Sequence, residues 1–249
     1  MTRGERRAAL VLGETVRALR HGDGWSLSGS ATLVPGAEHA DFYLVSAGVA
    51  DSTVECFLVD RDAHRLASSA PQDTLGGRGL EACDLLFDGV QIDGSARLAT
   101  GAVDAVRMLV RLGSAAVAVG LAQAAFEAAL RYSQQRSAFG QPICQHQAIQ
   151  LKLADMATRI TAARLLVYRA AERLDTREPI GTLMARIDAV ETAASVTLEA
   201  MRIHGGYGYT REFPVERLYR DAGWLMVSPQ TLDHERQELA RRWREAATA

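Results

Sequence analysis

The stretch HGGYGYTREFPVERLYRDA (204–222) places three glycines between two segments that both have a helical pattern. Gly205, Gly206 and Gly208 interrupt this pattern at a point where packing alone requires no bend. Glycine at such a place either allows a positive φ at a helix end or lets another molecule approach the backbone closely. Taken alone, the stretch is typical of a helix C-cap followed by a turn. The rest of the chain is needed to decide between these interpretations.

Apolar residues recur with a period of 3.6 from about residue 100 to the end of the chain. The first segment, VDAVRMLVRLGSAAVAVGLAQAAFEAALRYSQQR, is so rich in alanine that it should pack closely on several sides. The pattern predicts long helices that begin near residues 101, 146, 180 and 214, and the helical segment TLDHERQELARRWREA closes the chain. Several long antiparallel helices predict a bundle of the four-helix type.

The part of the chain from about residue 21 to 98 has a different pattern. Short apolar runs rich in β-branched and aromatic residues alternate with clusters of Gly, Asp and Ser. The expected strands are WSLSGSATLV, DFYLVSAG, STVECFLVD and ACDLLFDGVQI, and their close spacing predicts a small antiparallel sheet or barrel. The predicted fold class is therefore α+β, mostly α, with a β domain over 1–98 and a four-helix-type bundle over 99–249.

Composition narrows the classes of function. The 249 residues are 48% hydrophobic and 23% charged with a net charge of −2, which gives no electrostatic reason to expect nucleic acid or a membrane as partner. Three widely spaced cysteines suggest neither a disulfide framework nor a metal site and favour a reducing compartment. Glu14 follows too short an apolar run for a signal peptide, and no stretch approaches the roughly 18 apolar residues of a membrane span. We expect a cytoplasmic protein.

Three blocks of sequence carry a family resemblance. They are YSQQRSAFGQPICQHQAIQ (132–150), HGGYGYTREFPVERLYRDA (204–222) and, more weakly, LGGRGLEACDLLFDGVQI (75–92). In this arrangement the chain resembles the acyl-CoA dehydrogenase family over roughly residues 21–240. The family fold has an N-terminal helical domain, a middle β domain and a C-terminal four-helix bundle. This sequence is similar to the last two of these domains.

The resemblance implies a role for the glycine turn. In the family, the backbone N–H groups at the positions of Gly205 and Gly206 reach the FAD diphosphate of a neighbouring subunit, and helix ends suit such anions. Arg136 would pair with the same diphosphate, because a guanidinium binds phosphate in two places. Phe139 and Gln147 would border the adenine. Without the resemblance, Arg136 and Gln147 would be read as an exposed charge and an exposed amide.

Two further residues complete the cofactor-binding set that the resemblance implies. Thr231 matches the family threonine that contacts the flavin of its own chain. Arg202 replaces the usual glutamine beside the glycine pair, where its charge would either suit a diphosphate or pair with a carboxylate. The predicted cofactor-binding residues are Arg136, Phe139, Gln147, Arg202, Gly205, Gly206 and Thr231, and the catalytic residues stay unassigned.

Other parts of the family pattern are missing. The Thr-Glu-Pro-x-x-Gly-Ser-Asp stretch that holds flavin and substrate has no counterpart before His21. Leu33 and Pro35 stand where an aromatic residue would pack on the flavin and a threonine would bond its N5 atom, and proline has neither hydroxyl nor N–H. Pro229 occupies the usual position of the catalytic glutamate, and Val110 occupies the alternative one. The standard dehydrogenase reaction is therefore not expected of this chain alone.

Three interpretations remain open. The first is a short, catalytically deficient subunit of an acyl-CoA-dehydrogenase-like oxidoreductase that acts on the CH–CH group of acyl thioesters. It would form a homo- or hetero-oligomer, complete the FAD site of a full-length subunit, and bind FAD weakly or not at all when alone. The second is a flavin-independent dehydratase, isomerase or cyclase that acts on an acyl or polyketide-like substrate. Its acid/base candidates are His204, Asp221, His234 and Glu235. The third is a scaffold without activity.

Overall fold

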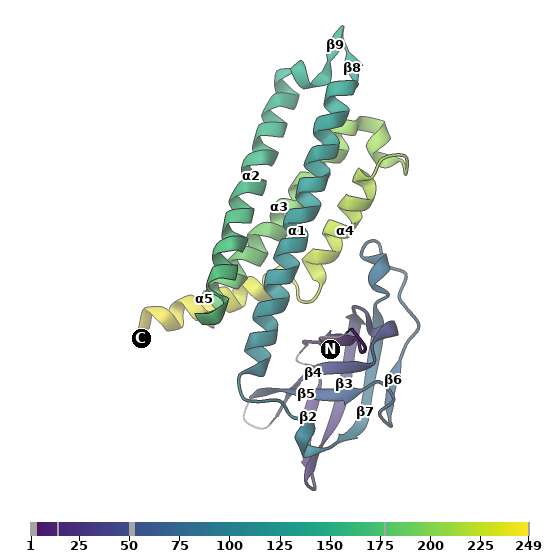
Figure 1. The fold of residues 1–249 in the computed structure, drawn as a ribbon, viewed down its shortest axis with the longest axis vertical. Coiled ribbons are helices and arrows are strands. Elements are labelled where there is room, and N and C mark those ends of the chain that lie inside the picture. The colour runs from purple at the N-terminus through teal and green to yellow at the C-terminus, as the bar shows by residue number, and fades with distance from the viewer. Residues whose placement is uncertain (1–3, 14, 50–52, 177, 249) are drawn as a thin grey trace. The chain divides into compact units, whose positions relative to one another are not determined.

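The computed structural model describes residues 4–13, 15–49, 53–176 and 178–248 (Figure 1). The chain divides into two compact units, Met1–Arg107 and Met108–Ala249. The first unit contains the β-sheet and the second contains the helices. The division lies within the first turns of helix α1 (Ala102–Gln135).

The first unit is a seven-stranded sheet that curls on itself. Its strands are β1 (Ala8–Val11), β2 (Arg17–His21), β3 (Gly24–Val34), β4 (Phe42–Gly48), β5 (Val54–Asp60), β6 (Leu66–Ser68) and β7 (Cys83–Ile92). The order of neighbours is β1-β4-β2-β3-β7-β6, and β5 pairs with β4. The longest pairing joins β3 to β7 in antiparallel register from Trp25–Ile92 to Val34–Cys83.

Four of these strands, β3, β4, β5 and β7, coincide with the four expected apolar runs. Ser52, in the third of those runs, lies outside the described residues. The sequence did not predict β1, β2 or β6, which are all five residues or shorter. The sheet is also not purely antiparallel, because β1 runs parallel to β4.

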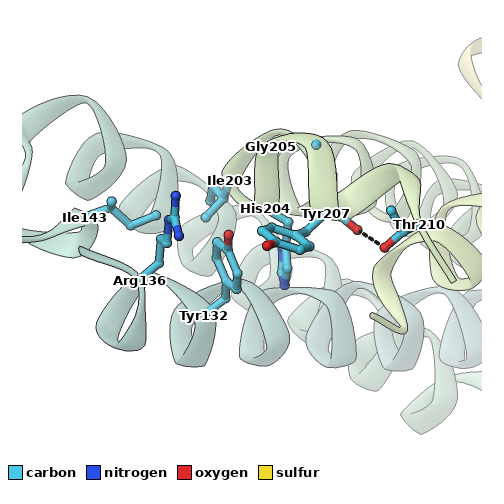
Figure 2. Close-up of a pocket in the computed structure, with 9 residues that line it drawn as sticks. Tyr132, Arg136, Ile143, Ile203, His204, Gly205, Tyr207 and Thr210 are labelled. Carbon is cyan, nitrogen blue, oxygen red and sulfur yellow. Dashed lines mark hydrogen bonds between the residues drawn. The ribbon is translucent and has the colours of Figure 1, made fainter. Parts of the chain in front are cut away.

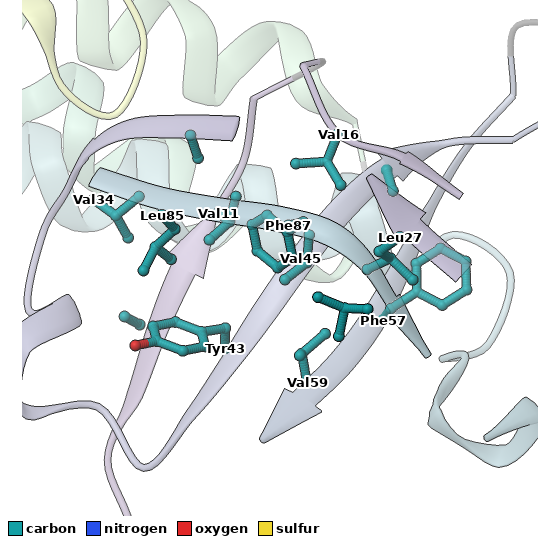
Figure 3. Close-up of a cluster of buried hydrophobic side chains, with 14 of the residues drawn as sticks. Val11, Val16, Leu27, Val34, Tyr43, Val45, Phe57, Val59, Leu85 and Phe87 are labelled. Carbon is teal, nitrogen blue, oxygen red and sulfur yellow. The ribbon is translucent and has the colours of Figure 1, made fainter. Parts of the chain in front are cut away.

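Apolar side chains from several strands form a single core in this unit (Figure 3). Leu27, Val45 and Phe57 are completely buried, and Trp25 packs on Phe57 edge-to-face with ring centroids 5.3 Å apart. Burial of each large apolar side chain contributes roughly 1.5–3 kcal/mol. This core therefore explains why the short strands form a stable sheet.

The second unit is the predicted bundle. Its helices are α1 (Ala102–Gln135), α2 (Gln147–Glu172), α3 (Pro179–His204), α4 (Val215–Val227) and α5 (Leu232–Thr248). The first four begin within one residue of the predicted positions, so the α+β fold class with a helical bundle is confirmed. A small hairpin of β8 (Ser137–Ala138) and β9 (Gln141–Pro142) follows α1, and a 3-10 turn, η7 (Gly205–Tyr209), follows α3.

The alanines of α1 pack inside the bundle. Their spacing of three and four residues places them on one face of the helix. Each of five along this face has no measurable exposure: Ala115, Ala118, Ala122, Ala125 and Ala129. A methyl side chain lets neighbouring helices approach closely, which is the packing that the alanine-rich sequence predicts.

The outer face of α1 is more apolar than the sequence led us to expect. This 34-residue helix is, among the described residues, the one helix long and apolar enough to cross a membrane by length and composition alone. The expectation that no stretch approaches this composition is therefore wrong. A bundle helix can pass the same test, but only 33% of the apolar window is buried within the chain. Leu109 and Val117 on this helix are more than half exposed.

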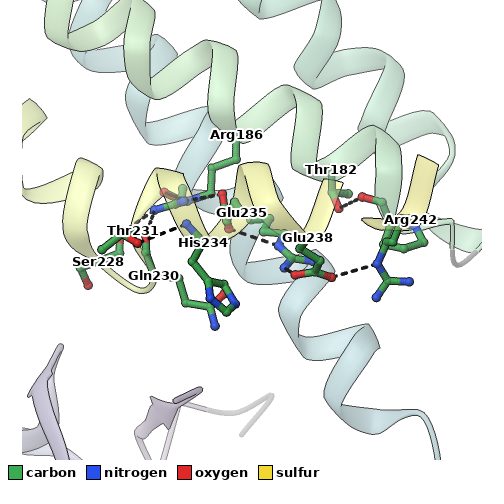
Figure 4. Close-up of polar contacts among 12 residues, drawn as sticks. Thr182, Arg186, Ser228, Gln230, Thr231, His234, Glu235, Glu238 and Arg242 are labelled. Carbon is green, nitrogen blue, oxygen red and sulfur yellow. Dashed lines mark hydrogen bonds and ion pairs between the residues drawn. The ribbon is translucent and has the colours of Figure 1, made fainter. Parts of the chain in front are cut away.

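Charged residues form a buried network at one end of the bundle (Figure 4). The guanidinium of Arg186 is fully buried and lies 2.5 Å from Oε2 of Glu235, which is 1% exposed. Arg111 pairs with the other oxygen of Glu235 at 3.2 Å and also with Glu238. Each buried charge therefore has an opposite charge beside it, which offsets the cost of removing it from water.

Candidate functional site

A pocket of about 470 Å³ lies where α1 and α3 end in the helical unit (Figure 2). The last turn of α1, the segment after β9 and the η7 turn supply its walls. Its lining residues are Tyr132, Arg136, Ile143, Ile203, His204, Gly205, Gly206, Tyr207 and Thr210. Arg136, Gly205 and Gly206 were predicted from the sequence as members of one site, and the structure brings these three together.

Glycine occurs at the three positions of the turn for different structural reasons. Gly205 ends α3 with φ of 60°, a conformation that favours glycine. A side chain at Gly208 would meet the Met201 carbonyl oxygen at 2.4 Å, so the fold itself needs a glycine there. Gly206 has neither a positive φ nor any atom within 4 Å of an added Cβ. The chain's own packing therefore leaves the backbone at Gly206 open to another molecule.

Arg136 supplies the positive charge of the pocket. Its backbone N–H closes the last turn of α1 on the Tyr132 carbonyl at 2.9 Å, and its carbonyl accepts from the N–H of Ile143 at 2.8 Å. The side chain is exposed and has no ion-pair partner among the described residues. None of the described residues that line the pocket carries a carboxylate. This arrangement can bind an anion.

Aromatic side chains are among the residues that line the pocket (Figure 2). His204 is 3% exposed and stacks on Tyr132 with ring centroids 4.3 Å apart. Phe213 packs edge-on against both rings, at 5.2 Å from His204 and 5.5 Å from Tyr132. Burial lowers the pKa of His204, although the bond to the Ala200 carbonyl opposes this shift. The imidazole is therefore neutral at pH 7, and its Nδ1–H donates to that carbonyl at 2.8 Å.

Other residues of the predicted set lie outside the pocket lining. Phe139, in the hairpin turn between β8 and β9, is 97% exposed, and Gln147 is exposed at the start of α2. Arg202 pairs with Glu199, which also pairs with Lys152. Burial raises the pKa of Glu199, but hydrogen bonds from Lys152 and Arg202 outweigh it and lower that pKa overall. Of the two roles considered for Arg202, the structure shows the pairing with a carboxylate.

Thr231 is also remote from this pocket. The 13-residue helix α4, about 20 Å long, separates the glycine turn from the loop that carries Thr231. Its hydroxyl accepts a hydrogen bond from the backbone N–H of His234 at 3.3 Å, as expected at the start of α5. The structure does not bring Thr231 together with Arg136 and the glycines.

The loop after α4 carries Pro229, which the resemblance places at the position of the family's catalytic glutamate. Arg186 fixes this loop by donating to the carbonyls of Leu225, Ser228 and Gln230 at 2.9, 2.9 and 3.1 Å. Nearby in the sequence, the carboxylate of Glu235 is buried between Arg111 and Arg186. Both oxygens of this carboxylate are therefore occupied by ion pairs within the bundle.

In the β unit, Leu33 and Pro35 stand where the resemblance places the residues that contact the flavin ring. Leu33 adopts φ of 52° at a register shift between β3 and β7, and its N–H donates to Asp84 at 2.8 Å. Pro35 follows and has no N–H to donate. Neither Leu33 nor Pro35 has the hydroxyl group with which, by the resemblance, a threonine would bond flavin N5.

Sequence reasoning missed several lining residues of the pocket. Tyr132 lies four residues before Arg136 and so shares its helix face, which the helical period could have indicated. Tyr207 and Thr210 follow the glycines directly, and the Thr210 hydroxyl donates to the Tyr207 carbonyl at 2.9 Å. His204 was named from the sequence as an acid/base candidate and not as part of this pocket, because its stacking on Tyr132 joins two segments far apart in sequence.

Comparisons with known proteins agree with this architecture. Residues 104–243 match the family model for the acyl-CoA dehydrogenase C-terminal domain. The 3-(aryl)acrylate reductase of Clostridium sporogenes is 34% identical over 96% of this chain and 69% of its own length. The mitochondrial short-chain specific acyl-CoA dehydrogenase of Bos taurus is 39% identical over 88% of this chain and 56% of its own length.

The fold comparison gives the same result. The solved structure of a variant of the Tcur3481-Tcur3483 steroid ACAD superposes with a TM-score of 0.91 and 29% identity. The match covers 99% of this chain and 69% of the other. The chain thus spans between about half and two thirds of the length of these relatives. Members of this family are flavoprotein oxidoreductases that use FAD. On sequence and fold together, the chain belongs to the acyl-CoA dehydrogenase family.

Proposed function

We propose that this chain is a catalytically deficient subunit of an acyl-CoA-dehydrogenase-like oxidoreductase. In this proposal it closes the FAD site of a full-length partner subunit, and the pair acts on the CH–CH group of an acyl thioester. The observation that carries the proposal is the pocket of Arg136 and the glycine turn, in which the described residues offer an unpaired guanidinium and open backbone but no carboxylate.

The residues of the pocket fit the diphosphate of FAD. Arg136 has no ion-pair partner in the described part of the chain, so its guanidinium is available for two phosphate oxygens. Gly206 leaves the backbone accessible because no other atom fills the space beside it. The neutral state of His204 leaves Arg136 as the charge that recognises the anion. When bound, FAD would accept the electrons removed from the acyl thioester.

Other residues of this chain are unsuited to binding the flavin ring and to accepting the substrate proton. Pro35 and Pro229 replace the groups that would bond flavin N5 and remove the substrate proton. The name of the similar Tcur3481-Tcur3483 steroid ACAD joins two designations, which supports assembly with a second kind of subunit. That partner would supply the ring-binding residues and the base.

A co-expression experiment tests this proposal. The chain is purified alone and together with a full-length acyl-CoA dehydrogenase subunit from the same organism, and FAD per complex is measured by absorbance. Arg136→Ala should lower the flavin content of the complex by about tenfold or more at limiting FAD, because a charge-assisted bond to phosphate contributes about 1.5–3 kcal/mol. Assembly itself should persist.

Arg131→Ala is the matched control. Arg131 lies five residues before Arg136, within α1, is 65% exposed and does not line the pocket, so its removal should leave the flavin content unchanged. Stoichiometric FAD in the chain purified alone would contradict the proposal. So would a co-purified complex in which Arg136→Ala retains full flavin.

The flavin-independent alternative has less structural support. It needs a free acid or base, yet Glu235 is held between two arginines and the Nδ1–H of His204 is held by a backbone carbonyl. His234 and Glu235 are adjacent on α5, where the first is exposed and the second buried, so their side chains diverge. We therefore propose the subunit role in preference to this one.

A further inference from the structure

A second pocket, of about 430 Å³, lies in the helical unit between α2, α3 and α5. It is near the start of α3, whereas the Arg136 pocket is near the end of that helix. The 26 residues of α3 span about 39 Å, so the two pockets are separate. The proposed FAD role makes no use of this second pocket.

Apolar side chains supply most of its wall. Leu166 of α2, Met184 of α3 and Trp243 of α5 line the space. Met184 and Trp243 are 38% and 54% exposed, so apolar surface faces the pocket rather than being covered by the chain. A volume of this size falls within the range of small-molecule sites. The interior therefore favours an apolar group.

Two arginines on the α2 side give the pocket a positive charge. Arg169 lies in the last turn of α2, Arg173 is the C-cap residue that follows this helix, and both line the pocket. Neither has an ion-pair partner in the part of the chain that the structure describes. The lining also includes Glu178, but its carboxylate accepts from the N–H groups of Ile180 and Gly181 at 2.7 and 3.4 Å. The arginines thus remain available to an anion.

We propose that this pocket binds an amphipathic carboxylate. The apolar tail lies against Leu166, Met184 and Trp243, and the carboxylate pairs with Arg169 and Arg173. An apolar wall with convergent cationic groups on one side recognises this combination and disfavours a cationic amphiphile.

Trp243 makes the proposal directly testable. Trp25 and Trp224 are 8% and 7% exposed, so a change of emission on ligand binding reports mainly Trp243. Monomeric decanoate should shift the emission of the full-length chain to shorter wavelength in a saturable way. Decyltrimethylammonium at the same concentration should not. Trp243→Phe should remove the shift, which assigns it to this site.

Two kinds of variant test the binding mode. Gly181→Leu places a side chain into the pocket, and its Cβ would meet only Glu178 Oε2 at 3.9 Å, so the helix accommodates it. This variant should abolish the saturable shift, and Gly223→Leu on α4, where a Cβ meets nothing within 4 Å, should not. Arg169→Gln with Arg173→Gln should weaken decanoate binding by at least ~10-fold.

Several results would overturn the proposal. They are no saturable shift with decanoate, an equal shift with the cationic amphiphile, or unchanged binding in the double arginine variant. Circular dichroism checks that the variants are folded. The double arginine variant changes only exposed side chains and should therefore fold. It tests the binding of the carboxylate even if Gly181→Leu fails to fold.

Discussion

Arg186 carries its charge with no side-chain exposure. Its three nitrogens donate to the Ser114 hydroxyl, to Glu235 and to three carbonyls of the loop after α4. A guanidinium with its donors satisfied can be buried, but removing it leaves both a carboxylate and several carbonyls without a partner. This single side chain therefore joins α3 to the loop that stands in place of the family's catalytic segment.

Arg186→Met is expected to destabilise the helical unit strongly. Methionine fills part of the volume but leaves Glu235 with one guanidinium instead of two, so the free energy of unfolding should fall by about 3–5 kcal/mol. Urea denaturation measures this change. Arg241→Met is the control, because Arg241 pairs with Glu245 at the surface with both side chains more than half exposed, and its loss should cost less than about 1 kcal/mol.

His204 should make stability depend on pH. Burial lowers its pKa in the folded state below the ordinary value of 6.5, so the unfolded chain takes up a proton first as pH falls. The stability that His204 contributes is therefore present above pH 6.5 and is lost as pH falls from that value toward the lower folded-state pKa. His204→Phe keeps an aromatic ring against Tyr132 and removes the titration.

The measurement is the free energy of unfolding of both proteins at about pH 7.5 and pH 5.5. The natural chain should lose more stability over this interval than His204→Phe does. Equal losses would show that His204 does not titrate differently in the folded and unfolded states.

At the scale of elements, the η7 turn contains two glycines whose replacement by alanine should affect stability very differently. Gly208→Ala would place a Cβ 2.4 Å from the Met201 carbonyl oxygen, so it should cost about 1–3 kcal/mol of stability. Gly206→Ala meets no atom within 4 Å and should change stability by less than about 0.5 kcal/mol. In the co-expressed complex, however, Gly206→Ala should lower flavin content. Thermal unfolding and flavin content measured on the same samples separate these two effects.

The sequence predicted the elements whose ends have clear chemical signals. Pro179 and Pro214 precede or start helices, and Gly205 ends one, so the helix boundaries could be placed closely. The strand β2 (Arg17–His21) was missed because only Ala18 of its five residues is buried. Its place in the sheet depends on pairing with β3, which the apolar pattern of β2 alone does not show.

The candidate site was predictable only in part for a similar reason. Arg136 and the glycines have distinctive chemistry in a recognisable motif. The contribution of Tyr132 and His204 depends on stacking between the end of α1 and the end of α3, which are about 70 residues apart in sequence. Arg202 has the right charge, but its ion pair with Glu199 on its own helix keeps it out of the pocket lining.

At the scale of the whole molecule, the helical unit leaves much apolar surface uncovered. On α2, Leu151, Leu165 and Tyr168 are each at least 60% exposed, and their spacing of 14 and 3 residues places them on one face. On α1, two thirds of the apolar window is not buried within the chain. Exposed apolar residues collected on helix faces mark surfaces for association. We therefore expect this chain to form a homo- or hetero-oligomer through its helices.

Leu165→Glu tests this expectation. In an interface, burying one leucine contributes roughly 1.5–3 kcal/mol, and a charge in its place must be desolvated, so association should weaken by at least ~10-fold. Sedimentation velocity at tens of micromolar, with the chain alone and with its co-expressed partner, measures the change. Leu19→Glu on β2 is the matched control, because Leu19 is 70% exposed but lies in the β unit. If the natural chain sediments as a monomer under both conditions, the helical faces do not mediate association. If both variants weaken the assembly equally, the contact is not specific to the bundle.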